Sequence, residues 1–246
     1  MLTNKELTSE LRKAVIQFWK TRSSQGNAQG ARSGQKDAGN RALVTGGKQM
    51  DGFVLLFARL IESEGIPRSA IHLDNTTLPG YYRPEKDWDL VVVHEGRLVA
   101  TIEFKSHVGP SFGNNFNNRV EEALGNATDL NTAYREGAFS PSSKPWLGYM
   151  MLLEEHPKSV APVRLRGKHF PAFIEFQKTS YLDRYKLFCT RLVRERLYDS
   201  TCFIASTAES GPRGEYNEPL EELSFLAFAA SLQSKLVEAA RRGGSK

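Results

Sequence analysis

Two short apolar runs in the middle of the chain constrain its fold most, because both are rich in β-branched residues and lie close together. They are Leu90–Val93 and Leu98–Ile102, and the segment His94–Arg97 between them contains a glycine, Gly96. β-Branched residues favour extended backbone, and glycine favours the tight turns that join antiparallel strands. The sequence therefore predicts a β-hairpin.

Polar side chains lie where the two predicted strands should meet. Side chains alternate along a strand, so Glu103 and Lys105 share one face while Phe104 between them points to the other. Asp89 precedes the first strand, which the hairpin folds back beside the end of the second. We therefore expect Asp89, Glu103 and Lys105 to meet in space.

Two carboxylates and a lysine at one edge of a sheet suit the hydrolysis of a phosphodiester. Mg²⁺ can neutralise the scissile phosphate, activate water and stabilise the leaving oxygen. Asp89, Glu103 and the carbonyl of Phe104 are candidate metal ligands, and Lys105 is a candidate for orienting the water and stabilising the phosphate. Charged residues are also common at the ends of strands because strand ends are exposed to solvent, and short patterns of this kind arise by chance. Spacing alone leaves both interpretations open.

The three residues resemble the motif of the PD-(D/E)xK nuclease superfamily, although the proline of that motif is missing. Two longer stretches of sequence are similar to the XhoI-like type II restriction endonucleases, and the resemblance extends over most of the chain. They are LPGYYRPEKDWDL (Leu78–Leu90) and EFKSHVGPSFGNNFNNR (Glu103–Arg119). This resemblance implies catalysis by Asp89, Glu103 and Lys105. It also implies Mg²⁺-dependent cleavage of both strands of the palindrome CTCGAG, leaving 5′ overhangs.

The resemblance also implies an α/β fold with a PD-(D/E)xK restriction-endonuclease-like core. Its order is αβββαβ, with a mixed sheet flanked by helices and with extra helices around it. In many members of the superfamily a helix before the hairpin lends a further acid to the metal site, and Asp51 is the candidate here. A surface charge is the alternative role for Asp51.

Apolar spacing along the rest of the chain agrees with such a core. It predicts helices over residues 3–20, 50–64, 120–137, 180–196 and 219–242, and strands over residues 71–73, 146–153 and 201–205. No internal repeat or linker divides the chain. We therefore expect residues 1–246 to form one nuclease domain.

The segment after the predicted hairpin is rich in groups that can read DNA. Asparagine and arginine present donors and acceptors to base edges, although asparagine and glycine also form turns. Because the family resemblance includes this segment, we expect residues 106–119 to form a loop that contacts DNA. The candidate contacts are Ser111, Asn114, Asn115, Asn117, Asn118 and Arg119, with Arg83 in addition.

A second polar segment, residues 21–48, is basic and rich in glycine, serine, glutamine and asparagine. The whole chain has a formal net charge of +5, which permits a polyanionic partner. Residues 21–48 are either a mobile basic arm that orders along DNA or a solvated loop, and both interpretations stay open. Their charged residues are Arg22, Arg32, Lys36, Asp37, Arg41 and Lys48.

Double-stranded DNA is the expected partner of the chain. A palindromic target favours a homodimer, which places one active site on each strand, and restriction implies a matching methyltransferase. No apolar run could span a membrane and no signal segment stands out, so we expect a bacterial cytoplasmic protein. Two alternatives remain: a less specific repair or recombination nuclease, and a DNA-binding module whose acids are structural.

Overall fold

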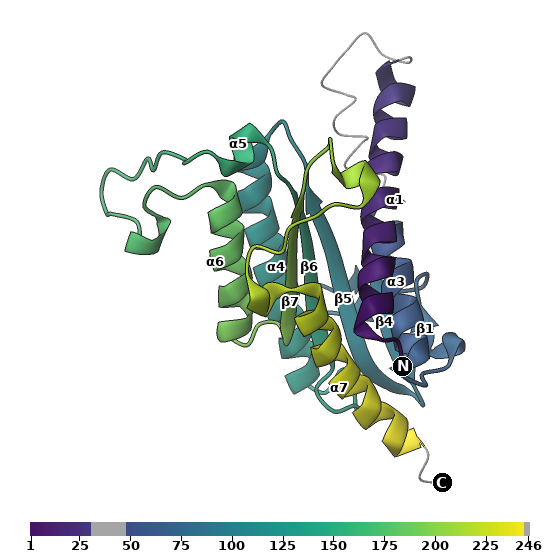
Figure 1. The fold of residues 1–246 in the computed structure, drawn as a ribbon. Coiled ribbons are helices and arrows are strands. Elements are labelled where there is room, and N and C mark those ends of the chain that lie inside the picture. Colours follow the sequence, from purple (N-terminus) through teal and green to yellow (C-terminus); the bar gives the residue numbers. More distant parts are fainter. Residues whose placement is uncertain (31–47, 244–246) are drawn as a thin grey trace.

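The computed structural model of the chain describes residues 1–30 and 48–243, and its fold is mixed α/β (Figure 1). A central five-stranded sheet has the order β1-β4-β5-β6-β7. Neighbouring strands are antiparallel from β1 to β5 and parallel from β5 to β7. The strands are β1 (Ile71–His72), β4 (Leu90–His94), β5 (Arg97–His107), β6 (Trp146–Glu154) and β7 (Ser200–Ser206).

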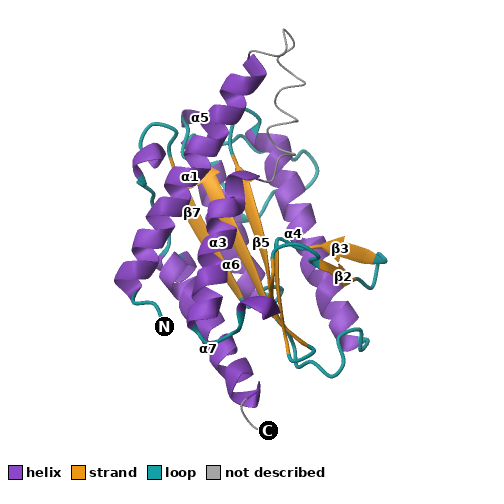
Figure 2. Ribbon diagram, turned by 90° about the vertical axis from the view of Figure 1, so that its right-hand side faces the viewer, coloured by secondary structure: helices purple, strands orange, loops and turns teal. Residues whose placement is uncertain are grey.

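Helices cover both faces of this sheet (Figures 1 and 2). One face packs against α1 (Asn4–Gly30), α3 (Asp51–Ser63) and α7 (Phe225–Gly243). The other face packs against α4 (Phe112–Arg135) and α6 (Tyr181–Arg194). The mixed sheet flanked by helices agrees with the predicted fold class. The described residues also contain several short helical elements: Lys48–Met50, Arg68–Ala70, α5 (Pro157–Val160), Ile174–Phe176, Gly211–Arg213 and Glu221–Leu223.

The predicted hairpin is present as β4 and β5. Its pairing runs from Leu90 opposite Ile102 to His94 opposite Arg97. Glu95 and Gly96 form the turn with φ of 51° and 70°, the left-handed backbone that two-residue hairpin turns require. The alternation of β5 is also confirmed, because Phe104 packs on Phe57 of α3 at a ring distance of 5.5 Å.

Most of the other predicted elements are confirmed within one or a few residues at their ends. Two helices begin with the capping box that their sequence suggests. Thr3 N–H donates to Glu6 Oε2 at 2.8 Å before α1, and Asp183 N–H donates to Ser180 Oγ at 3.1 Å in α6. The last helix starts at Phe225, later than expected, after a short 3₁₀ turn. No helix within the described residues is long and apolar enough to cross a membrane.

One prediction about a loop is wrong, and a second can be compared with the structure only in part. Residues 106–119 are not a loop, because β5 extends to His107 and α4 begins at Phe112. Phe112 and Phe116 lie one turn apart on α4 and contact aromatic rings of α6, which fixes a helix over asparagine-rich sequence. Residues 21–30 continue helix α1. Most of the rest of the polar segment 21–48, from residue 31 to residue 47, lies outside the described residues.

Candidate active site

Strand β5 carries Glu103 and Lys105 two residues apart, so that both side chains lie on one face, as predicted. The side chain of Glu103 is only 3% exposed and forms an ion pair with Lys105 on the same face of the strand. Lys105 Nζ also lies 3.9 Å from Asp89 Oδ2. The structure thus brings Asp89, Glu103 and Lys105 together, as expected, while their catalytic roles remain a prediction.

Asp89 lies directly before β4, at the point where β4 and β5 separate. The last pair of the two strands is Leu90 opposite Ile102. Beyond it, the N–H of Phe104 donates to Asp89 Oδ2 at 2.7 Å. The N–H and C=O of one strand residue point to the same side, so the carbonyl of Phe104 also faces the side of Asp89. A carboxylate and a carbonyl therefore converge beside Glu103.

A second lysine at this site was missed by sequence reasoning. Lys86 Nζ lies 2.9 Å from Glu103 Oε2, so the carboxylate sits between two ammonium groups. Lys86 belongs to a small hairpin of β2 (Thr77–Pro79) and β3 (Glu85–Asp87), which Figure 2 shows beside α4. Only a weak signal, Lys86 alternating with the buried Trp88, could have indicated it.

The turn of the β2–β3 hairpin is fixed by an acid on α4. Asp129 Oδ1 accepts hydrogen bonds from the N–H groups of Tyr81 and Tyr82, both at 2.7 Å. Asp129 Oδ2 accepts another from Arg83 Nε at 2.7 Å. A Cβ at Gly80 would clash with the same carboxylate, so the turn requires glycine there. The turn thereby holds β3, and with it Lys86, against Glu103 of the candidate active site.

Burial and neighbouring charges shift the pKa values of Asp89, Glu103 and Lys105, but not all in the same direction. Burial raises the pKa of Asp89, and the negative charge of Glu103 raises it further. Burial also disfavours the carboxylate of Glu103, but Lys105 and Lys86 outweigh this effect and lower its pKa. Burial disfavours the ammonium of Lys105, yet Glu103 and Asp89 outweigh it and raise its pKa. Glu103 and Lys105 are therefore held as a charged pair.

The remaining predicted residues are placed less directly at this site. Arg83 donates to Asp129 and Asn126 of α4, which is a structural contact. Arg119 pairs with Glu122 on the same face of α4, and within the described residues its Nε has no hydrogen-bond partner. Asp51 is the first residue of α3, which packs on the face of the sheet opposite Glu103, and its role as a further acid stays a prediction.

The other candidate DNA contacts lie at the start of α4. Ser111 is the N-cap residue of this helix, and its side chain makes no capping hydrogen bond. Three of the asparagines are exposed and the fourth is half-buried. They stay candidates for contact with DNA, on a helix instead of the expected loop. The exposed ones are Asn114, Asn117 and Asn118, and the half-buried one is Asn115.

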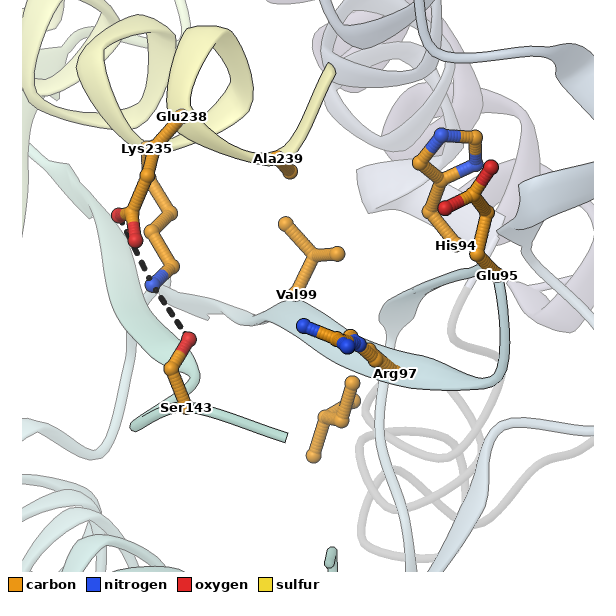
Figure 3. Close-up of a pocket in the computed structure, with 9 residues that line it drawn as sticks. His94, Glu95, Arg97, Val99, Ser143, Lys235, Glu238 and Ala239 are labelled. Carbon is orange, nitrogen blue, oxygen red and sulfur yellow. Dashed lines mark hydrogen bonds and ion pairs between the residues drawn. The ribbon is translucent and has the colours of Figure 1, made fainter. Parts of the chain in front are cut away.

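The pocket of Figure 3 lies elsewhere, at the turn of the β4–β5 hairpin beside α7. Its volume is about 60 Å³, enough for a few water molecules. Lys235 lies between Ser143 and Glu238 at 3.3 Å from each, so its charge is already compensated. None of the candidate catalytic residues lines this pocket.

Comparisons with known proteins point in one direction. Residues 29–218 match the family described as Restriction endonuclease XhoI. The chain is 50% identical to the type II restriction enzyme BstVI of Geobacillus stearothermophilus, over 80% of this chain and 91% of the relative. It is 46% identical to the type II restriction enzyme XhoI of Xanthomonas vasicola, over 74% and 73% of the two chains. No solved structure matches significantly.

Proposed function

This chain belongs to the XhoI family of type II restriction endonucleases, and on that premise we propose that it cuts both strands of CTCGAG with Asp89, Glu103 and Lys105. The family makes it a site-specific deoxyribonuclease acting on DNA. The observation that carries the residue assignment is the convergence of two carboxylates and a lysine at the fork between β4 and β5.

The same observation supports placing the chain in the PD-(D/E)xK superfamily. One acid stands before a strand, and the second acid and the lysine lie two residues apart on the adjacent, central strand. Helices on both faces of the mixed sheet fit the αβββαβ core. The small β2–β3 hairpin is an addition to that order, and it brings Lys86 to Glu103.

Mg²⁺ is the proposed cofactor, since type II restriction endonucleases generally use it. Within the described residues, no three His, Cys, Asp or Glu side chains are placed to hold a metal ion. Mg²⁺ is commonly bound by one or two carboxylates together with water and substrate phosphate. Asp89, Glu103 and the carbonyl of Phe104 fit that donor set. Bound there, Mg²⁺ would supply charge neutralisation at the phosphate and a more acidic water.

The residues around this donor set have distinct proposed roles. Lys105, which reaches both acids, would orient the attacking water and stabilise negative charge on the phosphate. Lys86 would keep the buried carboxylate of Glu103 ionised and in place. The N–H of Phe104 fixes the orientation of Asp89. In this proposal the catalytic groups are already in place before DNA binds, so that catalysis requires no movement of β5.

Two plasmids that differ by a single CTCGAG test the proposal. With Mg²⁺, the purified protein should linearise only the plasmid that contains the site, and ligation should reveal 5′ overhangs. Asp89→Asn, Glu103→Gln and Lys105→Ala should each reduce the cleavage rate by about three orders of magnitude or more. Each variant should still be folded, as shown by a cooperative thermal unfolding transition. The exposed Glu62→Gln on α3 is the matched control and should cut normally.

Other outcomes would select one of the alternatives. Degradation of both plasmids would favour a less specific repair or recombination nuclease. Binding of CTCGAG without any cleavage would favour a DNA-binding module with structural acids. A variant of the three residues that cuts at the normal rate would remove its residue from the catalytic assignment.

The palindromic target supports two further proposals about partners. A homodimer would place one active site on each strand, because twofold symmetry of the protein matches that of the DNA. A methyltransferase that modifies CTCGAG would protect the host genome without any need to contact this chain. Both proteins would act in the bacterial cytoplasm.

A further inference from the structure

A basic groove lies between the start of α4 and the segment 161–178, here called the basic arm, which connects α5 to α6. Figure 1 shows the basic arm extending away from the body of the molecule. The groove has a volume of about 800 Å³. Its polar lining comes from Asn114, Asn117, Arg164, Arg166, Lys168 and Arg184.

The base of the basic arm is fixed to α6. The N–H of Val163 donates to the carbonyl of Thr179 at 2.8 Å, which ties the two ends of the arm together. Arg184 donates from Nε to Thr179 Oγ1 at 3.2 Å and from Nη2 to the carbonyl of Val163 at 3.3 Å. The first residues of the arm therefore leave the body from a defined position.

The cations of the basic arm are uncompensated. Val163 and Leu165 are half-buried, whereas Arg164 and Arg166 are exposed, which is the alternation of an extended segment. Lys168 follows at a bend and is exposed as well. None of the three forms an ion pair with any described residue. The acid of the arm, Glu175, pairs with Arg191 at 3.3 Å instead. Three like charges within five residues repel one another, and a polyanion would relieve that repulsion.

Helix α4 connects the groove with the active site. The helical repeat puts Arg119 and Asn126 on the flank of α4 that meets the β2–β3 turn, and Asn117 on the opposite flank beside the arm. The exposed ridge between these flanks carries Asn114 and Asn118. A major groove of DNA admits an α-helix. One duplex lying across this ridge could therefore contact both the active site and the arm.

We propose that Arg164, Arg166 and Lys168 bind the phosphate backbone of the DNA target, and hold the duplex across the start of α4 during cleavage. This inference rests on the proposed function, because it takes the substrate to be duplex DNA. Extended backbone places the side chains of Arg164 and Arg166 roughly 6.6 Å apart, about the separation of neighbouring phosphates along one strand. Contacts of this kind position the duplex and add affinity without reading its sequence.

A charge-removing triple variant tests the proposal. Arg164→Gln, Arg166→Gln and Lys168→Gln are combined, and binding to a CTCGAG duplex is measured without Mg²⁺ at several salt concentrations. Each phosphate contact contributes about 0.9 to the slope of log K against log salt, so the slope should become shallower by about 2 to 3. The dissociation constant should rise roughly tenfold or more. The control triple Lys5→Gln, Lys13→Gln and Arg59→Gln removes the same charge from exposed positions of α1 and α3.

A charge-retaining triple separates charge from folding. Arg164→Lys, Arg166→Lys and Lys168→Arg should restore most of the salt slope, whereas a structural role of the arm would not be rescued in this way. An unchanged slope and dissociation constant in the charge-removing triple would overturn the inference, even if the enzyme cuts CTCGAG. A loss of affinity that accompanies dissociation of a dimer would overturn it too, since the arm would then contact a second copy. A wild-type protein that neither binds nor cuts CTCGAG would instead refute the proposed function.

Discussion

The most constrained residue of the proposed active site is Glu103. A buried carboxylate is costly unless opposite charges and hydrogen bonds compensate it, and Glu103 is compensated by Lys105 and Lys86. Removal of one partner leaves the other lysine to hold the charge alone. Because Asp89 is 38% exposed, water and substrate can reach the site from its side. Glu103 thus supplies a fixed charge and Asp89 an accessible one.

His107, at the end of β5, makes the stability of the protein depend on pH. Burial lowers the pKa of His107 to about 4, and its ring contacts Tyr185 and Phe112. The unfolded chain binds the proton near pH 6.5, so the stabilising contribution is complete above that pH and is lost as pH falls toward 4. Between about pH 7.5 and about pH 5 the loss should be about 2 kcal/mol.

Urea unfolding of the wild type and of His107→Gln at the two pH values measures this contribution. The carboxylates are the same in both proteins, so the difference between their pH dependences isolates the histidine. The variant should be less stable at the higher pH and should lose about 2 kcal/mol less on acidification. Equal losses in both proteins would show that His107 is not held neutral in the folded state.

At the scale of elements, the β2–β3 hairpin depends on α4 through Asp129. Asp129→Ala would leave the N–H groups of Tyr81 and Tyr82 without their acceptor and free Arg83. We expect a loss of about 2 kcal/mol in unfolding free energy. The cleavage rate should fall at least about tenfold. Lys86 would lose the support of the hairpin, and catalytic groups that are displaced by about 1 Å react more slowly. Stability and cleavage rate are measured together.

The exposed acid Glu121, also on α4, provides the matched control for this change. Glu121→Ala should keep both the stability and the cleavage rate of the wild type. If Asp129→Ala is destabilised but cuts normally, the hairpin does not position Lys86 for catalysis. If neither property changes, the hydrogen bonds to Asp129 have no energetic importance.

The elements that the sequence predicted well are those with local signals. The β4–β5 hairpin follows from two β-branched runs and Gly96, and α6 begins at the capping pair Ser180 and Asp183. Asp89, Glu103 and Lys105 came from that hairpin together with a family resemblance. Lys86 could not be predicted in the same way, because its position depends on α4, which lies far along the chain.

The start of α4 is a second case in which a contact between distant parts of the chain decides the structure. Glycine and asparagine are weak helix formers, so residues 112–119 favour a loop when the sequence is considered alone. Phe112 and Phe116 nevertheless pack on Tyr181 and Tyr185 of α6, and this tertiary contact outweighs the local preference. As a result, the candidate DNA contacts lie on a helix. Their geometry could be known only after the two helices were placed together.

At the scale of the whole molecule, the described part of one chain carries one cluster of the proposed catalytic residues, whereas a double-strand break needs two phosphodiester cleavages. A palindrome relates its two scissile phosphates by a twofold axis, and a homodimer has the same symmetry. The basic arm and the start of α4 would then repeat on each half of the site. A dimer therefore accounts for cleavage of both strands without a second active site in the chain.

This argument predicts that a dimer with one inactive chain only nicks its target. Wild-type and Glu103→Gln chains are co-expressed with different affinity tags, and mixed dimers are purified through both tags. They should convert a supercoiled plasmid with one CTCGAG into an open circle, whereas wild-type dimers linearise it. Sedimentation should give twice the 27.6 kDa of one chain. Linearisation by mixed dimers at the wild-type rate, or full activity at the mass of one chain, would contradict the dimer, because a single active site would then cut both strands.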